Sequence, residues 1–230
     1  MSKQKLRGKG AIITGGSTEV AQAVGLALAR EGARICLCGR QTDLLELGAE
    51  KIRAAGGVCL TQVSELDSLE AAESVLEHAR SGLKRIDIVI LVSPFWAGGE
   101  IHAHKIKTWK MVIDANLNEP FLMARAVLPV FREQGQGEVM AIGSDSALGY
   151  YPMDGAYGVA MHALTALMEL IRVENTEFGI RTHILSPGVA ATAGTDASGQ
   201  STLTANEVAE WAIWLLTRPG HLRGTGPVRI

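Results

Sequence analysis

The sequence has little of several features that would place it in a special class of protein. Only three of its 230 residues are cysteines, aromatic residues make up 5%, and the formal net charge is −2. This charge gives no electrostatic basis for binding nucleic acid or an anionic membrane. The apolar run behind the basic start, Ala11-Ile12-Ile13, is too short for a signal-peptide core or a membrane span. We therefore expect a cytoplasmic protein that contacts neither nucleic acid nor a membrane.

The cysteines indicate a reducing compartment and no metal site. Cys36, Cys38 and Cys59 all fall in segments that read as buried strands. An odd number of cysteines in the core suits the cytoplasm better than a disulfide framework. The pair Cys36 and Cys38 could be half of a metal site, but no histidine is near and both share one strand face. We expect them to be small core residues.

The residues that are present predict one α/β domain. Hydrophobic residues make up 47% and charged residues 20%, as in a globular protein with a large core. Short apolar runs alternate with amphipathic stretches, which implies right-handed crossovers and a parallel sheet covered on both faces. We predict a single Rossmann-like, doubly wound domain over residues 1–230, with a seven-stranded parallel sheet and helices on both faces.

The predicted elements follow the chain in strict alternation. Strands are expected at 10–14, 33–38, 57–63, 86–92, 137–143, 180–186 and 225–230. Helices are expected at 18–31, 43–55, 67–81, 104–134 (broken at Pro120), 155–178 and 204–217. The small polar stretch 189–203 has almost nothing to bury and reads as a mobile lid.

A glycine-rich turn joins the first strand to the first helix. It reads Thr14-Gly15-Gly16-Ser17-Thr18-Glu19-Val20-Ala21, and such a turn places backbone N–H groups where a pyrophosphate can bind. Here the chain resembles the short-chain dehydrogenase/reductase family, whose turn has the form T-G-x-x-x-G-x-G. Thr14 and Gly15 match, whereas Glu19 and Ala21 replace the second and third glycines. The Glu19 carboxylate either occupies the anion site itself or points to solvent.

Other positions also match the family's cofactor site. Arg40 ends the second strand, where a basic residue in the family reads the adenosine 2′-phosphate, so the resemblance implies NADP rather than NAD. Arg40 could equally be the polar start of a loop. Pro187, Gly188 and Thr192 match the family's P-G-x-x-x-T, whose threonine contacts the nicotinamide amide.

Two further positions depart from that cofactor site. Gln62 stands where the family has an aspartate that holds the adenine, and Val92-Ser93-Pro94 replaces the family's Asn-Ala-Gly. Phe95-Trp96, which follows, could fill space that a cofactor would use. Departures around a single ligand favour weak cofactor binding or none.

The catalytic positions are filled, with one exception. Ser144 precedes Tyr157 by the separation that the family uses for the serine that polarises the substrate and the tyrosine that transfers the proton. Asn116 falls where the family has an asparagine that holds a water. Asp145, beside Ser144, is either an additional acid or a turn residue. One helical turn after Tyr157, Met161 stands where the family has a lysine.

The missing lysine matters because it lowers the tyrosine pKa and binds the nicotinamide ribose in the family. A free phenol has a pKa near 10, and a cation within about 4–6 Å lowers a pKa by roughly 1–3 units. The uncharged side chain of Met161 cannot lower the tyrosine pKa in this way. It extends an apolar helix stripe with Tyr157, Leu164, Met168 and Ile171.

Three hypotheses about function remain open. The first is a non-catalytic subunit that forms a homo- or hetero-oligomer through helices 104–134 and 155–178, pairing with an active paralogue. The second is an active NADP(H)-dependent oxidoreductase of carbonyl or alcohol substrates with an atypical site. The third is a cofactor-free lyase similar to halohydrin dehalogenases, which have an arginine at the lysine position.

Overall fold

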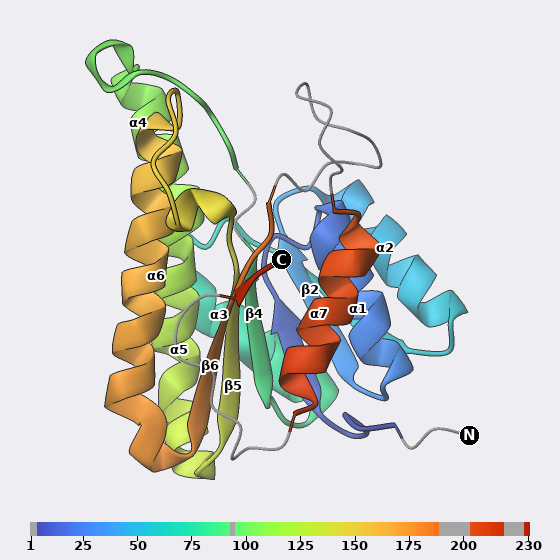
Figure 1. Cartoon of the computed structure of the whole chain (residues 1–230). Helices are drawn as coiled ribbons and strands as arrows, with labels where there is room; N and C mark the ends of the chain where they lie inside the picture. Colours follow the sequence, from blue (N-terminus) through green and yellow to red (C-terminus); the bar gives the residue numbers. More distant parts are fainter. Residues whose placement is uncertain (1–3, 93–94, 189–202, 219–227) are drawn as a thin grey trace.

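The structure is a computed structural model that describes residues 4–92, 95–188, 203–218 and 228–230. It shows a parallel sheet with the strand order β3-β2-β1-β4-β5-β6-β7 between two layers of helices (Figure 1). The strands are β1 Gly10–Ile13, β2 Arg34–Gly39, β3 Val58–Val63, β4 Ile88–Val92, β5 Gly137–Ile142, β6 Ile180–Ser186 and β7 Val228–Arg229. The predicted single Rossmann-like α/β domain is therefore correct in its architecture.

The last strand is much shorter than the expected strand over 225–230. Only Val228 and Arg229 pair, in parallel with Leu185 and Ser186 of β6. Residues 225–227 lie outside the described part of the chain, as does most of the expected lid. The sheet is thus six full strands with a two-residue pairing at one edge, rather than seven full strands.

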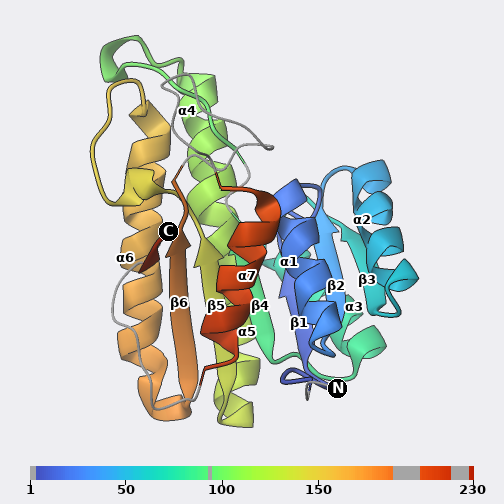
Figure 2. The ribbon, with the colours of Figure 1, turned by 45° about the vertical axis from the view of Figure 1, so that its right-hand side comes forward.

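Helices cover both faces of the sheet, as Figure 2 shows. One layer contains α1 Glu19–Arg30, α2 Thr42–Ala54 and α7 Ala205–Leu216, and the other contains α3 Leu69–Leu83, α5 Glu119–Gln134 and α6 Gly155–Asn175. Each layer packs its apolar side chains against one face of the strands, so the core forms two clusters separated by the sheet. This arrangement explains why the strands are apolar on both faces.

The long helix predicted over 104–134 is not broken at Pro120. It consists of α4 Ile106–Ile113, a π-helical turn Asp114–Asn118, and α5, which follows without a gap. Pro120 lies in the first turn of α5, where a residue without an N–H is tolerated. The sequence predicted an irregularity at Pro120, and in the structure the irregularity is the π turn just before this residue.

Helix α6 lies at the edge of its layer, beside α5 (Figure 2). Together with the turn that follows it, over residues 155–178, it is long and apolar enough to pass a composition test for a membrane span, which core helices also pass. Its predicted stripe of Tyr157, Met161, Leu164, Met168 and Ile171 is buried against the sheet. The stripe is accounted for by packing in the domain core.

The cysteines are core residues, as predicted. Cys36, Cys38 and Cys59 are free and buried. Burial raises the pKa of Cys36 to about 12 and that of Cys59 to about 11, so both thiols are protonated at neutral pH. Within the described ranges, no group of three His, Cys, Asp or Glu residues could hold a metal ion.

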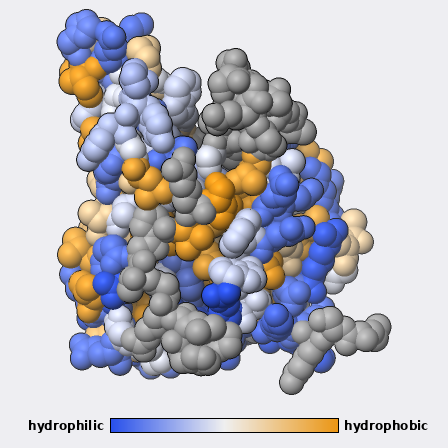
Figure 3. Space-filling model, viewed as in Figure 1, coloured by the Kyte–Doolittle hydropathy of each residue, from blue (hydrophilic) through white to orange (hydrophobic). Residues whose placement is uncertain are grey.

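The outer surface differs between the helices of the first layer. In Figure 3, hydrophobic surface gathers over and beside α7, whereas hydrophilic surface dominates on the side of α1 and α2. Trp211 and Trp214 of α7 are partly exposed and meet edge to face. The Arg218 guanidinium lies 3.2 Å from the centre of the Trp214 ring, which covers part of this apolar surface.

Candidate functional site

A cavity of about 610 Å³ lies at the carboxyl ends of the central strands. Strand order reverses between β1 and β4, and in open α/β sheets ligands bind in the crevice at such a point. The cavity is lined by Thr18, Val20, Val92, Trp96, Ile142, Gly143, Ser144, Asp145, Ser146, Tyr151, Asp154, Tyr157, Pro187 and Gly188. These residues follow β1, β4, β5 and β6, so the fold brings four separate loops to one site.

The glycine-rich turn is built as the sequence predicts. Gly15 has a φ of 62°, a left-handed conformation that glycine adopts without strain. The Thr18 hydroxyl accepts from the N–H of Ala21 at 3.2 Å and donates to the Gly15 carbonyl at 2.8 Å. The Thr14 hydroxyl accepts from the N–H of Val92 at 3.2 Å and so ties the end of β1 to β4. Thr14 and Gly15 therefore shape the turn beside the cavity.

Glu19 does not occupy the anion site of this turn. Its side chain is exposed and does not belong to the described cavity wall, and Thr18 rather than Glu19 caps α1. Of the two positions considered for this carboxylate, the structure favours the one that points to solvent. An acidic residue in the first turn of a helix is favourable there without any contact to a ligand.

Arg40 is held by a carboxylate of another helix. Its guanidinium forms an ion pair with Glu119, the first residue of α5, and its side chain is 51% exposed. Burial raises the pKa of Glu119 to about 7, although the positive charge of Arg40 opposes this rise. Arg40 does not line the cavity, so the structure separates it from Ser144 and Tyr157.

The departures at Gln62 and Phe95-Trp96 have different consequences. Gln62 lies at the end of β3, where its amide donates to the carbonyl of Val63 at 3.3 Å, and it does not reach the cavity. Phe95 packs against the core, whereas Trp96 lines the cavity and is 64% exposed. Trp96 therefore borders the cavity without closing it, and its effect on the space that a cofactor would use stays a prediction. Ser93 and Pro94 lie outside the described residues.

Ser144 and Tyr157 meet in the cavity wall. The Ser144 hydroxyl lowers the pKa of Tyr157, and it lies 3.2 Å from Oδ1 of Asp145, to which it donates. Tyr157 is 8% exposed. Pro187 and Gly188 line the same cavity, while Thr192 lies outside the described residues. The predicted serine and tyrosine therefore lie in the wall of one cavity.

Met161 occupies the space below this pair. It is buried, and a Cβ placed on Gly143 would lie 3.3 Å from its sulfur, so the thioether fills the hollow left by that glycine. Burial raises the pKa of Tyr157, the hydroxyl of Ser144 opposes this rise, and the charges of Asp154 and Asp145 raise the pKa further. The Tyr157 phenol is therefore harder to ionise than a free one.

Asn116 is brought to a different place. It is fully buried in the π turn, where its amide donates to the carbonyls of Phe95 at 2.6 Å and Val112 at 2.9 Å. Its Oδ1 accepts from the N–H of Phe95 at 3.3 Å. Asn116 does not line the cavity, and its role visible here is to hold the loop that carries Trp96.

Asp154 is a site residue that sequence reasoning missed. It lines the cavity three residues before Tyr157, a spacing that places both side chains on one face when a helix begins there. This three-residue spacing is the sequence signal from which Asp154 could have been recognised as a site residue. Asp145, predicted as an additional acid or a turn residue, also lines the cavity.

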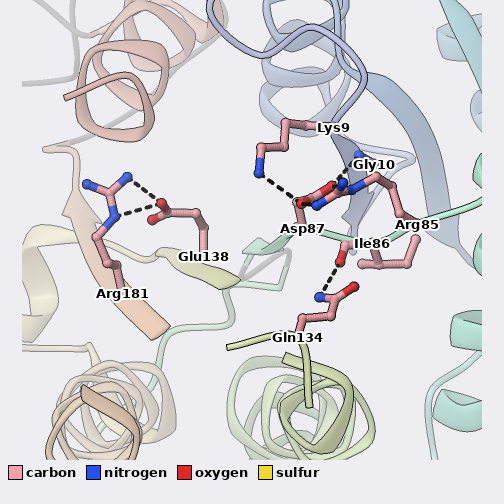
Figure 4. A network of polar contacts seen from close by, with 8 residues as sticks. All are labelled: Lys9, Gly10, Arg85, Ile86, Asp87, Gln134, Glu138 and Arg181. Atoms are coloured by element: carbon pink, nitrogen blue, oxygen red, sulfur yellow. Dashed lines mark hydrogen bonds and ion pairs between the residues drawn. The ribbon is translucent and has the colours of Figure 1, made fainter. Parts of the chain in front are cut away.

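A second cavity of about 550 Å³ lies at the opposite, amino ends of the strands, and its two acidic residues, Asp87 and Glu138, are both paired with basic side chains (Figure 4). The Asp87 carboxylate accepts from Lys9 at 2.9 Å, from Nε of Arg85 at 2.7 Å and from the N–H of Gly10 at 3.1 Å. Glu138 accepts from Arg181 at 2.7 Å and contacts His183 at 2.8 Å. These contacts join neighbouring strands, which gives the charges a structural role.

Comparisons with known proteins give a consistent result. The family profile described as short chain dehydrogenase matches residues 9–202. A glycine betaine reductase of Emericella nidulans is 29% identical over 96% of this chain, which spans 18% of that protein's length. An uncharacterized oxidoreductase of Listeria monocytogenes is 30% identical over 81% of this chain and 76% of its own.

Solved structures share the fold at low sequence identity. An NAD⁺-bound xylitol dehydrogenase has a TM-score of 0.90 at 20% identity and covers 98% of both chains. A metagenomic short-chain oxidoreductase in complex with NADP has a TM-score of 0.84 at 23% identity and covers 98% of this chain and 97% of its own.

Proposed function

Because the chain belongs to the short chain dehydrogenase family, we propose that it is a member with impaired or absent hydride transfer, acting as a non-catalytic subunit that pairs with an active paralogue. The observation that carries this proposal is the buried thioether of Met161 below Gly143. No cation reaches Tyr157 from that position.

The consequence concerns proton transfer. General acid–base catalysis works best with a pKa near the operating pH, and a phenol with a pKa near 10 is ionised to about one part in a thousand at neutral pH. Here burial and two neighbouring carboxylates raise the pKa of Tyr157 above that value. The phenol can donate a hydrogen bond to a ligand, but it is a poor base for an alcohol.

The cavity also suits a nicotinamide cofactor poorly. In the family this cofactor supplies or accepts the hydride. Its pyrophosphate would lie against the turn at Gly15 and Thr18, and its nicotinamide end beside Pro187 and Gly188. The described lining, however, contains two carboxylates and no Lys, Arg or His, and Arg40 is bound to Glu119. We propose that NADP or NAD binds weakly or not at all.

The test of this proposal is a calorimetric titration of the purified protein with NADPH and NADP⁺, followed by carbonyl-reduction assays. We expect no binding at micromolar concentration and no consumption of NADPH. Micromolar binding together with reduction of any carbonyl compound contradicts the proposal.

A substitution at the lysine position separates catalytic loss from loss of the fold. Met161→Lys is expected to lower the pKa of Tyr157 by about 1–3 units, because its ammonium would lie one helical turn from the phenol. The ultraviolet difference titration of tyrosinate, with Tyr157→Phe as the blank, measures this shift. Met161→Leu, which keeps the apolar packing, is the control and should leave the titration unchanged.

A second candidate function is supported by one observation. Ser144 and Tyr157 both lie in the wall of an open cavity, as an oxidoreductase of carbonyl or alcohol substrates requires. Turnover of NADPH by the unmodified protein, lost in Tyr157→Phe, would favour this function over the first.

Pairing with another subunit would use the helices predicted for it. Phe121 of α5 and Val159, Leu170 and Val173 of α6 are exposed apolar side chains, and such surfaces mark interaction sites when they are contiguous. We propose that α5 and α6 form the oligomer interface. Size-exclusion chromatography with light scattering should show an oligomer that Leu170→Glu dissociates. Glu77→Gln, a change at an exposed residue of α3, should leave the oligomer intact.

A further inference from the structure

Two side chains beside the start of α6 each bury a polar atom that has no hydrogen-bond partner. Among the residues that the structure describes, three buried side-chain atoms form no hydrogen bond: Nε2 of His104, Oδ2 of Asp154 and Oγ of Ser186. Buried polar atoms are nearly always hydrogen bonded, because an unpaired one loses its bonds to water and gains nothing in return. Two such atoms in one place therefore call for a physical explanation.

Two glycines of α6 show that these atoms lie near each other. A Cβ placed on Gly155, the residue after Asp154, would lie 2.9 Å from Nε2 of His104, so the imidazole packs against the backbone at this point. A Cβ placed on Gly158 would lie 3.5 Å from Oδ2 of Asp154. Positions three residues apart on a helix are neighbours, with Cβ atoms about 5–6 Å apart. The imidazole and the carboxylate therefore lie over the same turn of α6.

The two atoms are complementary in their chemistry. A carboxylate oxygen accepts hydrogen bonds, whereas the ring nitrogen of a neutral imidazole that carries the proton donates one. Asp154 stands at the N-cap position of α6, but its side chain makes no capping hydrogen bond. The His104 ring meets the ring of Trp109 edge to face, with 6.0 Å between the ring centres. Each of the two orphaned atoms is thus the kind of partner that the other lacks.

His104 and Asp154 belong to two segments that form part of the cavity wall. The loop 95–105 carries Trp96, and the turn before α6 carries Tyr151 together with Asp154. Figures 1 and 2 show the two segments side by side at the upper ends of α4 and α6. A contact between His104 and Asp154 would therefore join two walls of the cavity.

The first half of the loop is already held by backbone contacts. The amide of Asn116 binds the backbone of Phe95, and the N–H of Gly99 donates to the carbonyl of Met153 at 2.7 Å. Met153 has a φ of 72°, a left-handed conformation that is costly for a residue other than glycine and that recurs at clamps and switches. Strain and unmet hydrogen bonds thus coincide at the turn before α6.

From these observations we propose that His104 and Asp154 are the two halves of a clasp. In the closed state the loop 95–105 moves toward α6 until the Nε2–H of His104 donates to Oδ2 of Asp154. The structure shows the open state, in which both atoms are buried but do not meet. Because Trp96 lies on the moving loop and Tyr151 on the turn, closing narrows the cavity between them. The clasp goes beyond the proposed function, since it needs neither a nicotinamide cofactor nor a partner subunit.

The hydrogen bond is tested in the intact protein by nitrogen-15 NMR of the His104 ring. We expect a ring N–H signal at Nε2 that exchanges slowly with water. The signal should persist in Asp154→Asn, whose amide oxygen can accept the same bond, and disappear in Asp154→Leu, which has no acceptor. Absence of the signal from the unmodified protein, or its persistence in Asp154→Leu, overturns the clasp.

The effect of the clasp on the loop is tested by hydrogen exchange at the N–H of Gly99. His104→Phe keeps an aromatic ring but cannot donate, so this N–H should exchange about tenfold faster, as expected when a hydrogen bond to a charged group is lost. In the Asp154→Leu background the same substitution should add nothing, because the partner is already gone. Additive effects overturn the clasp. His102→Phe, a change at an exposed histidine of the same loop, is the matched control and should leave the exchange unchanged.

The width of the cavity is tested by acrylamide quenching of tryptophan fluorescence. The signal of Trp96 is obtained as the difference between each protein and the same protein with Trp96→Phe. We expect Trp96 to be quenched more strongly in Asp154→Leu than in Asp154→Asn, because only the asparagine can still close the clasp. Equal quenching in these two variants overturns the narrowing of the cavity.

Discussion

The two ends of the sheet use charge in opposite ways. At the amino ends, Asp87 and Glu138 each lie against two basic side chains, and these contacts tie neighbouring strands together. At the carboxyl ends, Asp145 and Asp154 line a cavity that brings no basic side chain to them from the described residues. The acidic side chains at the amino ends are therefore compensated within the fold, whereas those in the lining of the carboxyl-end cavity form no ion pair with the described residues.

The largest effect is expected at the amino end. Asp87→Asn removes a carboxylate that is 2% exposed and accepts from Lys9, Arg85 and the N–H of Gly10. Burial raises the pKa of Asp87, but its bonds to Arg85 and Lys9 outweigh burial and lower it. We expect the free energy of unfolding to fall by about 3 kcal/mol in a urea titration at neutral pH.

The control for this loss is Asp43→Asn, an exposed aspartate in the first turn of α2. Its change should stay below about 1 kcal/mol. Because the pKa of Asp87 is lowered by folding, its stabilisation is present at neutral pH and lost as pH falls through the acid range. An unchanged acid dependence in Asp87→Asn contradicts the pairing.

An intermediate effect is expected at Glu119, whose counter-charge is a single half-exposed arginine. Burial raises its pKa from the ordinary 4.5 to about 7, so the folded protein retains a proton that the unfolded chain releases. Stability therefore falls as pH rises from about 4.5 to 7. Glu119→Gln should remove this fall and gain about 2 kcal/mol above pH 7, measured by urea unfolding across pH. Glu50→Gln, a change at an exposed residue of α2, should keep the original pH dependence of the free energy of unfolding.

The smallest effect on stability is expected at the carboxyl end. Asp154→Asn removes a charge that forms no ion pair with the residues that the structure describes, so the free energy of unfolding should change by less than about 1 kcal/mol, with either sign. A loss as large as that of Asp87→Asn would mean that Asp154 supports the fold, and the contrast between the two ends would fail.

Most of the fold could be predicted from patterning because buried parallel strands are apolar on both faces. The strand predicted at 180–186 is β6 to the residue, and the one at 137–143 is β5 with one residue less. The π turn was not foreseen, because Pro120 marks an irregularity without specifying its form. Of the last strand, predicted over 225–230, the described residues form a strand only at Val228 and Arg229, and nothing in the sequence indicates how few residues pair.

The site was predictable where it depends on spacing along the chain and unpredictable where it depends on distant contacts. The meeting of Ser144 and Tyr157 followed from their separation. The pairing of Arg40 with Glu119 joins residues far apart in sequence, so no local pattern announces it. The sequence left two positions open for the Glu19 carboxylate, and it could not choose between them because the cap of the helix is formed by its neighbour, the hydroxyl of Thr18.

The π turn also constrains which deletions the chain can tolerate. Asn116 binds the backbone of Phe95 from within this turn, which holds one side of the cavity. Removing one residue between Asp114 and Asn118 would allow a regular α-helix, but it would rotate α5 relative to α4 by about 100°. The apolar face of α5 would then leave the sheet, or Asn116 would leave Phe95. The length of this turn is thus fixed by two requirements at once, one of the core and one of the cavity.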